Sequence, residues 1–353
     1  MYKPPYRVLS LKEIKEIKKS HKVISTFSGC GGSSLGYRMA GLKVIWANEF
    51  IPEAQKAYRE NKEEECFLNL KDIRNISAED ILNEAKVKIG EIDIFDGSPP
   101  CSSFSTAGKR EKGWGKIKKY SSTAQRTDDL FFEYIRLIRG TKPKVFVAEN
   151  VSGLIKGAAK GYFIKILEEL KNSGYRVKCA LLDAKYLGVP QSRQRTIFIG
   201  VRNDINKNPV FPKPLPYFYT LADVLYNIDK KYNIIEKESD ITKYCTGREW
   251  DRLKIGSQSE KYFNLVRPAL NKPCPTICAS HGSQGIASVT HPFEKRKFSI
   301  YELKRICGFP DDFNLNGKYE ENWERLGRSV PPVMMMHIAK EIKNNILDKN
   351  ENS

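Results

Sequence analysis

Residues 23–36 read VISTFSGCGGSSLG, and this stretch decides the fold of the chain. It opens with a short apolar run typical of a buried strand, turns through closely spaced glycines and continues as a helix-like segment. A strand, a glycine turn and a helix in this order let a nucleotide-like ligand approach the N–H groups of the helix N-terminus. The stretch therefore predicts the opening unit of an α/β sheet with a ligand site.

A spaced acid supports this interpretation. The next apolar run ends in Glu49, 20 residues after Gly29, and this spacing suits a carboxylate that binds ribose hydroxyls. The turn and the acid together indicate an adenosine-containing cofactor. They do not distinguish a dinucleotide from S-adenosylmethionine.

A reactive cysteine follows another strand-like run, residues 92–95, which leads into DGSPPC at residues 96–101. The two prolines fix φ and remove backbone donors, so the thiol of Cys101 is held in place. It lies at the carboxyl end of a strand, where open α/β sheets build their ligand crevices. A lone cysteine is more often a small buried filler, and the neighbouring motifs favour a nucleophile here.

Two further segments bring polar side chains to strand ends. One apolar run ends in Glu149, for which a helix N-terminal acid or a salt-bridge partner would be slightly favoured if it stood alone. Gln191, Arg193 and Arg195 alternate ahead of another strand-like run, which puts them on one side of an extended segment. Two guanidinium groups on one face suit phosphate or carbonyl recognition, although an ordinary edge strand has the same pattern.

Taken in order, these segments resemble the cytosine-C5 DNA methyltransferase family of the bacterial restriction-modification type. The resemblance covers about residues 22–340 and includes GFP at 308–310 and GRSVP at 327–331. An ordered set of motifs is far more specific than any single one. The resemblance implies an α/β, Rossmann-like S-adenosylmethionine-dependent methyltransferase sheet. The cofactor residues that it implies are Phe27, Gly29, Gly31, Gly32, Glu49, Phe50, Asp72, Ile73, Pro100, Leu130 and Ser329.

Three positions depart from the family pattern. Ser25 stands where an Asp usually opens the cofactor motif, Ser102 replaces the usual Gln after the nucleophile, and Arg328 replaces the usual Asn in the last motif. The first and third lie where the family contacts the methionine end of the cofactor.

The family's chemistry explains the residue types. Cytosine C5 is a poor nucleophile, so a thiolate first adds to C6 while an acid at N3 takes up the developing charge. The resemblance assigns Cys101 to the thiolate, Glu149 to N3 and Arg195 to the ring O2. Arg193 is expected to contact a neighbouring phosphate or Glu149 itself.

Duplex DNA is the expected partner. The target base must leave the stack to be reached, and the basic segment 103–126 is a candidate closing loop. Base-reading residues are expected on a Gly/Ser-rich scaffold outside the catalytic motifs. The candidate DNA contacts are Ser105, Lys109, Arg110, Gln191, Arg248, Arg252, Gln258, His281 and Gln284.

Composition agrees with a nucleic-acid enzyme. The net charge is +18 over 353 residues and the isoelectric point is near 9.4, which favours a polyanionic partner. Eight cysteines without a Cys-x-x-Cys pair and only four histidines predict reduced thiols, no metal site and a cytoplasmic location. We expect no membrane association, a monomer, and a cognate restriction endonuclease that acts on the same site without stable contact.

Three parts are predicted along the chain. Residues 1–202 are the first part of the catalytic and cofactor-binding domain, residues 203–295 the smaller, irregular target recognition domain, and residues 296–353 the return to the catalytic domain. A proline-rich connector, FPKPLP at 211–216, lies close to the first boundary.

Three alternatives stay open at this stage. The same motifs would suit a cytosine-C5 methyltransferase acting on structured RNA, or a non-catalytic nucleic-acid-binding module of the same fold. A nicotinamide oxidoreductase is more distant, because its chemistry explains neither Cys101 nor Glu149.

Overall fold

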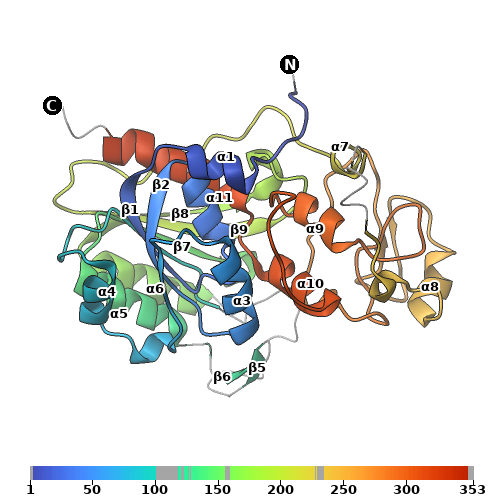
Figure 1. Cartoon of the computed structure of the whole chain (residues 1–353), viewed down its shortest axis with the longest axis horizontal. Helices are drawn as coiled ribbons and strands as arrows, with labels where there is room; N and C mark the ends of the chain where they lie inside the picture. Colours follow the sequence, from blue (N-terminus) through green and yellow to red (C-terminus); the bar gives the residue numbers. More distant parts are fainter. Residues whose placement is uncertain are drawn as a thin grey trace. The chain divides into compact units, whose positions relative to one another are not determined.

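The computed structural model describes residues 3–100, 118–120, 123–125, 127, 129–155, 160–226, 228 and 234–348 (Figure 1). The chain divides into two compact units. The sheet unit comprises residues 16–182, 194–213 and 335–353, and the irregular unit comprises residues 1–15, 183–193 and 214–334.

A seven-stranded sheet organises the sheet unit. Its strand order is β3-β2-β1-β4-β7-β9-β8. Parallel pairing joins β1 to β2, β2 to β3, β1 to β4 and β4 to β7, whereas β7 and β9 are antiparallel. The strands are β1 (Ser20–Thr26), β2 (Leu42–Asn48), β3 (Phe67–Asn69), β4 (Ile94–Gly97), β7 (Val145–Val151), β8 (Tyr175–Asp183) and β9 (Gln194–Arg202).

The strand order reverses between β1 and β4, because β2 and β3 extend the sheet on one side and β4, β7, β9 and β8 on the other. Ligand crevices of open α/β sheets lie at this point, outside the carboxyl ends of the strands. The glycine turn follows β1 and the Pro-Pro-Cys segment follows β4. The predicted α/β fold is therefore confirmed.

Helices cover the sheet and bury its apolar residues. In the sheet unit they are α2 (Gly32–Met39), α3 (Pro52–Asn61), α4 (Ala78–Ala85), α5 (Leu130–Thr141) and α6 (Lys160–Asn172). Figure 1 shows α4, α5 and α6 grouped together, and their apolar residues share one core with Phe95, Phe146 and Phe198 of the strands. Tyr134 of α5 ties two strands, because its hydroxyl donates to the carbonyls of Phe95 and Val147.

Short elements build the irregular unit. They are α7 (Leu221–Leu225), α8 (Cys245–Trp250), α9 (Ile300–Ile306), α10 (Tyr319–Arg328) and the antiparallel pair β10 (Ser257–Gln258) and β11 (Val266–Arg267). Two helices cross the unit boundaries, α1 (Leu11–Glu16) and α11 (Pro332–Ile342). A further antiparallel pair, β5 (Lys118–Tyr120) and β6 (Thr123–Gln125), lies in the segment between β4 and α5.

The compact units do not follow the three predicted parts. Residues 1–15, 183–193 and 296–334 group with 214–295 rather than with the sheet. The reason is local packing: α9 and α10 pack against each other, and Trp323 of α10 donates to the carbonyl of Cys278. The assignment of residues 203–295 to target recognition concerns function and stays a prediction.

Among the described residues, no helix combines the length and apolar character needed to cross a membrane.

Candidate functional site

The glycine turn after β1 has an unusual backbone. Phe27, Gly29 and Gly31 all have positive φ, at 52°, 57° and 100°, a region that residues other than glycine rarely adopt. A Cβ placed on Gly29 would meet no atom within 4 Å, whereas one on Gly31 would lie 3.2 Å from the ring of Tyr58. The turn thus leaves open space beside its backbone at Gly29, which suits the close approach of a ligand.

Glu49 closes this turn from the neighbouring strand. It directly follows β2 and is 6% exposed. Its carboxylate accepts hydrogen bonds at 2.7 Å from the backbone N–H groups of Gly29 and Ile51. The predicted ribose-binding acid therefore also fixes the turn, a second role that its spacing in the sequence did not reveal.

The other predicted cofactor residues mostly belong to the sheet unit. Asp72 accepts from the backbone N–H and the guanidinium of Arg74, which also pairs with Asp129 just before α5. Ile73 and Leu130 are buried. Phe50 and Pro100 are partly exposed, and Gly32 begins α2. Ser329 lies in the irregular unit, where its hydroxyl donates to the carbonyl of Arg325.

An ion pair joins two of the predicted catalytic residues. Nε of Arg195 lies 2.7 Å from Oε1 of Glu149, and the two side chains are 13% and 10% exposed. They come from β9 and β7, whose antiparallel pairing places Arg195 opposite Val151. Arg195 also donates to the carbonyl of Gln194 at 2.7 Å. A fixed carboxylate beside a guanidinium can bind one flat ring at two atoms, because the carboxylate accepts a hydrogen bond from a ring donor and the guanidinium donates one to a ring acceptor.

The same strand end is tied to the Pro-Pro segment. The side-chain amide of Asn150 donates to the carbonyl of Pro99 at 3.1 Å. This hydrogen bond links the residue after Glu149 to the residue two positions before Cys101. Cys101, Ser105, Lys109 and Arg110 lie outside the described residues.

The structure also identifies a buried acid that the sequence analysis did not assign. Asp96 of β4 is 1% exposed and accepts hydrogen bonds from the hydroxyls of Tyr37 and Ser25 at 3.0 and 3.2 Å. Burial raises the pKa of its carboxyl group to about 7, and the nearby negative charge of Glu149 acts in the same direction. The sequence feature that could have identified Asp96 is its position directly after an apolar run.

Two predicted contacts need correction. Gln191 is 0% exposed, and its side-chain amide donates to Sγ of Cys307 at 3.3 Å. Arg193 is 2% exposed, and its guanidinium donates to the carbonyls of Ile277, Gly327 and Ser329 at 2.7–3.1 Å. Neither side chain has free surface for DNA, and the pair with Glu149 is made by Arg195. Both residues instead hold segments of the irregular unit together.

The predicted base-reading residues fall into two groups. Arg248, Arg252 and Gln258 are exposed. His281 is only 6% exposed, which leaves little of its side chain for a base contact, and its role in reading bases stays a prediction. Burial, with the charge of Lys297, lowers the pKa of His281 to about 4. Gln284 is partly exposed, but its amide already bonds Tyr244 and the carbonyl of Lys237.

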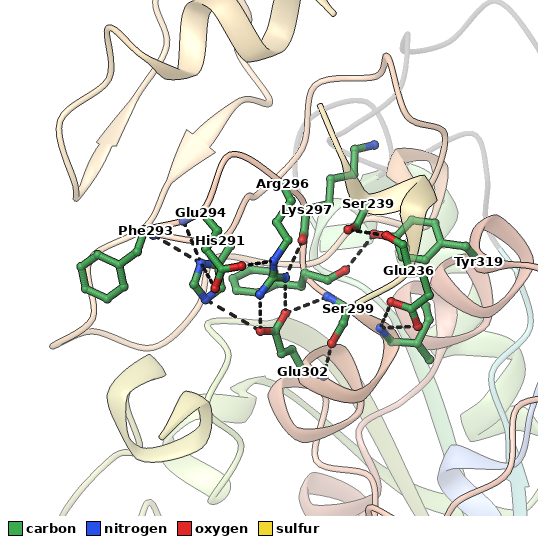
Figure 2. A network of polar contacts seen from close by, with 12 residues as sticks. Glu236, Ser239, His291, Phe293, Glu294, Arg296, Lys297, Ser299, Glu302 and Tyr319 are labelled. Carbon is green, nitrogen blue, oxygen red and sulfur yellow. Dashed lines mark hydrogen bonds and ion pairs between the residues drawn. The ribbon is translucent and has the colours of Figure 1, made fainter. Parts of the chain in front are cut away.

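A buried polar network supports the loop that begins at His281. Nζ of Lys297 donates to the carbonyls of His281, Gly282 and Ser283. The adjacent Arg296 makes two 2.8 Å contacts with Glu302, which also accepts from the N–H of Ser299 (Figure 2). Lys297 is fully buried, so its ammonium group needs these carbonyls. The network indicates a loop held in one conformation.

The described residues contain no group of three or more His, Cys, Asp or Glu side chains arranged to hold a metal ion.

Residues 21–344 match the family model of C-5 cytosine-specific DNA methylases. The chain is 31% identical to the Type II methyltransferase M.NgoFVII of Neisseria gonorrhoeae, over 94% of this chain and 89% of that protein. It is also 31% identical to the Type II methyltransferase M.Bsp6I of a Bacillus species, over 92% of this chain and 99% of the relative.

Solved structures with the same fold include a protein of E. coli described as a DNA modification methyltransferase encoded within a prophage. Its TM-score is 0.72 at 22% identity, over 92% of this chain and 99% of that one. A DNMT2 protein of Spodoptera frugiperda has a TM-score of 0.65 at 20% identity, with the same coverage.

Proposed function

This chain belongs to the family of C-5 cytosine-specific DNA methylases, and from that premise we propose how its own residues carry out methyl transfer. It is a DNA (cytosine-5-)-methyltransferase. Of the alternatives left open by the sequence, the DNA enzyme is therefore confirmed over the RNA enzyme and the non-catalytic module.

The Glu149–Arg195 pair carries the mechanistic proposal. A cytosine presents a ring nitrogen N3 next to the carbonyl O2, and the pair offers an acid and a guanidinium 2.7 Å apart at the end of β7. Glu149 contacts N3 and Arg195 holds O2, so that the ring is polarised toward addition at C6. Cys101 supplies the thiolate that adds to C6 and leaves when the C5 proton is lost. The hydrogen bond from Asn150 to Pro99 supports this arrangement, because it ties the acid's strand to the cysteine's segment.

S-adenosylmethionine is the proposed cofactor, and when bound it supplies the electrophilic methyl group. Phe27, Gly29, Gly31 and Gly32 form the turn beside which it would lie, and Glu49 would bind its ribose. The open space at Gly29 and the held carboxylate of Glu49 support this fit. The remaining cofactor contacts that we propose are Phe50, Asp72, Ile73, Pro100, Leu130 and Ser329.

The DNA is bound with the target cytosine turned out of the duplex. We propose that residues 203–295 select the site, that Arg248, Arg252 and Gln258 contact it, and that Ser105, Lys109 and Arg110 belong to a segment that closes on the DNA. The relatives are named Type II methyltransferases, which supports a restriction-modification role. We propose that a separate endonuclease acts on the same site. A cytoplasmic location is proposed because the thiolate needs reducing conditions. We also propose that the enzyme is a monomer.

Bisulfite sequencing tests this function directly. DNA from cells that express the chain should carry 5-methylcytosine at one short sequence, and DNA from cells that express Cys101→Ser should not. An RNA substrate assayed in parallel should remain unmodified. Methylation by the serine variant at the wild-type level would remove Cys101 from the mechanism.

A further inference from the structure

The end of β4 carries a buried carboxylate that the proposed mechanism does not use. Asp96 is 1% exposed and accepts from the hydroxyls of Tyr37 and Ser25, with the side chain of Ser33 as a further donor. Among the described residues it forms no ion pair, and the charge beside it is that of another acid, Glu149. Asp96 thus has neutral donors and no counter-ion among the side chains that the structure describes.

A nearby buried carboxylate, that of Asp93, has a cationic partner. Asp93, three residues earlier, pairs with Lys144 at 2.8 Å and faces His21 at 3.8 Å. A buried carboxylate without a cation costs several kcal/mol when ionised. Lys144 supplies such a cation at Asp93, and within the described part of the chain no cation does so at Asp96.

The position of Asp96 links it to the glycine turn. In the β1–β4 ladder it lies opposite Ser25, and Ser28 donates to the carbonyl of Ser25 at 2.8 Å and lies 3.2 Å from its hydroxyl. Tyr37, the second donor, belongs to α2. β1 and β4 are also the strands between which the sheet order reverses, where ligands of such sheets bind.

We propose that Asp96 is the counter-charge for the cationic methionine part of S-adenosylmethionine, supplied from β4 because Ser25 leaves β1 without an acid. This inference rests on the cofactor named under the proposed function. S-adenosylmethionine carries an ammonium and a sulfonium group against one carboxylate, whereas S-adenosylhomocysteine lacks the sulfonium charge. The Asp96 carboxyl group gives up its proton to the solvent when the cation binds, and its carboxylate favours the cofactor that carries the sulfonium charge over the product that lacks it.

Calorimetry with both ligands tests this proposal. At pH 6.5, titration in buffers of different ionisation enthalpy should show that the wild type releases a proton when it binds S-adenosylmethionine, and a smaller amount with S-adenosylhomocysteine. Asp96→Asn should lose the release. Its preference for S-adenosylmethionine over S-adenosylhomocysteine should fall about tenfold relative to the wild type, as expected for one partly screened charge pair.

Two further variants separate charge from folding. Asp93→Asn removes a buried acid from the same segment and should leave the ligand preference unchanged. Asp96→Ser combined with Ser25→Asp moves the acid back to β1 and should restore both the preference and the proton release.

Unchanged proton release and unchanged preference in Asp96→Asn would overturn the proposal, as would a double variant that binds both ligands equally. A wild type that binds neither ligand would overturn the cofactor assignment itself and this inference with it.

Discussion

Glu149→Gln separates the chemical role of the acid from its structural role. Glutamine keeps the size of the side chain and an oxygen that can accept from Arg195, but it cannot transfer a proton to N3. A positioned acid contributes about two to four orders of magnitude to a rate. We therefore expect the single-turnover rate of methyl transfer to fall by that factor, with binding of DNA nearly unchanged.

The expected cost in stability follows from the contacts of the pair. Removing one partner of a buried ion pair costs about 3–5 kcal/mol when the other charge is left alone. Arg195 is not left alone here, because it also donates to the carbonyl of Gln194 at 2.7 Å and the amide oxygen of the substituted side chain would still accept. We expect a decrease in the free energy of unfolding of about 1–3 kcal/mol.

The assay combines rapid-quench transfer from tritiated S-adenosylmethionine with urea unfolding of the same preparation. Glu169→Gln is the matched control, because it removes a partly exposed glutamate that pairs with Arg139 at 2.6 Å. The control should lose under about 1 kcal/mol and keep its rate. If Glu149→Gln reacted within a few-fold of the wild type, the acid would be structural and the proposed role at N3 would be refuted.

Four other outcomes are expected. Cys101→Ser should form no adduct with 5-fluorocytosine DNA in denaturing electrophoresis, where the wild type is trapped. Glu49→Gln should weaken S-adenosylmethionine binding by about 1.5–3 kcal/mol in calorimetry, because the NH2 group of glutamine would face the N–H of Gly29 or Ile51, a donor against a donor. Equal affinity of the variant and the wild type would remove Glu49 from the site. Arg252→Ala should relax one position of the site by about 1–3 kcal/mol in competition binding, whereas Lys254→Ala should weaken all sequences alike and lower the salt slope by about one. Burial alone would raise the pKa of Asp93, but the nearby His21 ring and hydrogen bonds from Lys144 and the backbone N–H of Lys22 lower it to about 2. Its roughly 2–3 kcal/mol of stability is therefore present above pH 4 and lost as the pH falls toward 2, and Asp93→Asn should flatten that part of the urea-unfolding profile.

Local patterns in the sequence were sufficient to predict the α/β sheet and the order of the motifs along it. Apolar runs followed by glycine or proline marked β1 and β4, and an apolar run that ends in Glu149 marked β7. A strand buried on both faces must be apolar, and the chain must turn at its end. Side chains just after such runs meet at one edge of a parallel sheet. Glu49 and Glu149 could therefore be placed near a ligand crevice without any knowledge of long-range contacts, although strand β4 itself begins two residues later than the apolar run suggested.

Burial and pairing between distant segments could not be derived in this way. Alternation put Gln191, Arg193 and Arg195 on one side of an extended segment, but carbonyl groups up to 136 residues away enclose Arg193, whereas Arg195 meets Glu149. His281 looked like an exposed polar residue and is covered by its own unit.

The same distinction explains why Asp96 became visible only in three dimensions. The sequence by itself determined that an acid directly follows an apolar run and that position 25 lacks one. Only the tertiary structure decided that these two positions face each other across β1 and β4 and that no described cation meets the carboxylate. The physical reason is that strand register and the charges around a buried group depend on neighbours from far along the chain, whereas strand ends and turns depend on neighbours a few residues away.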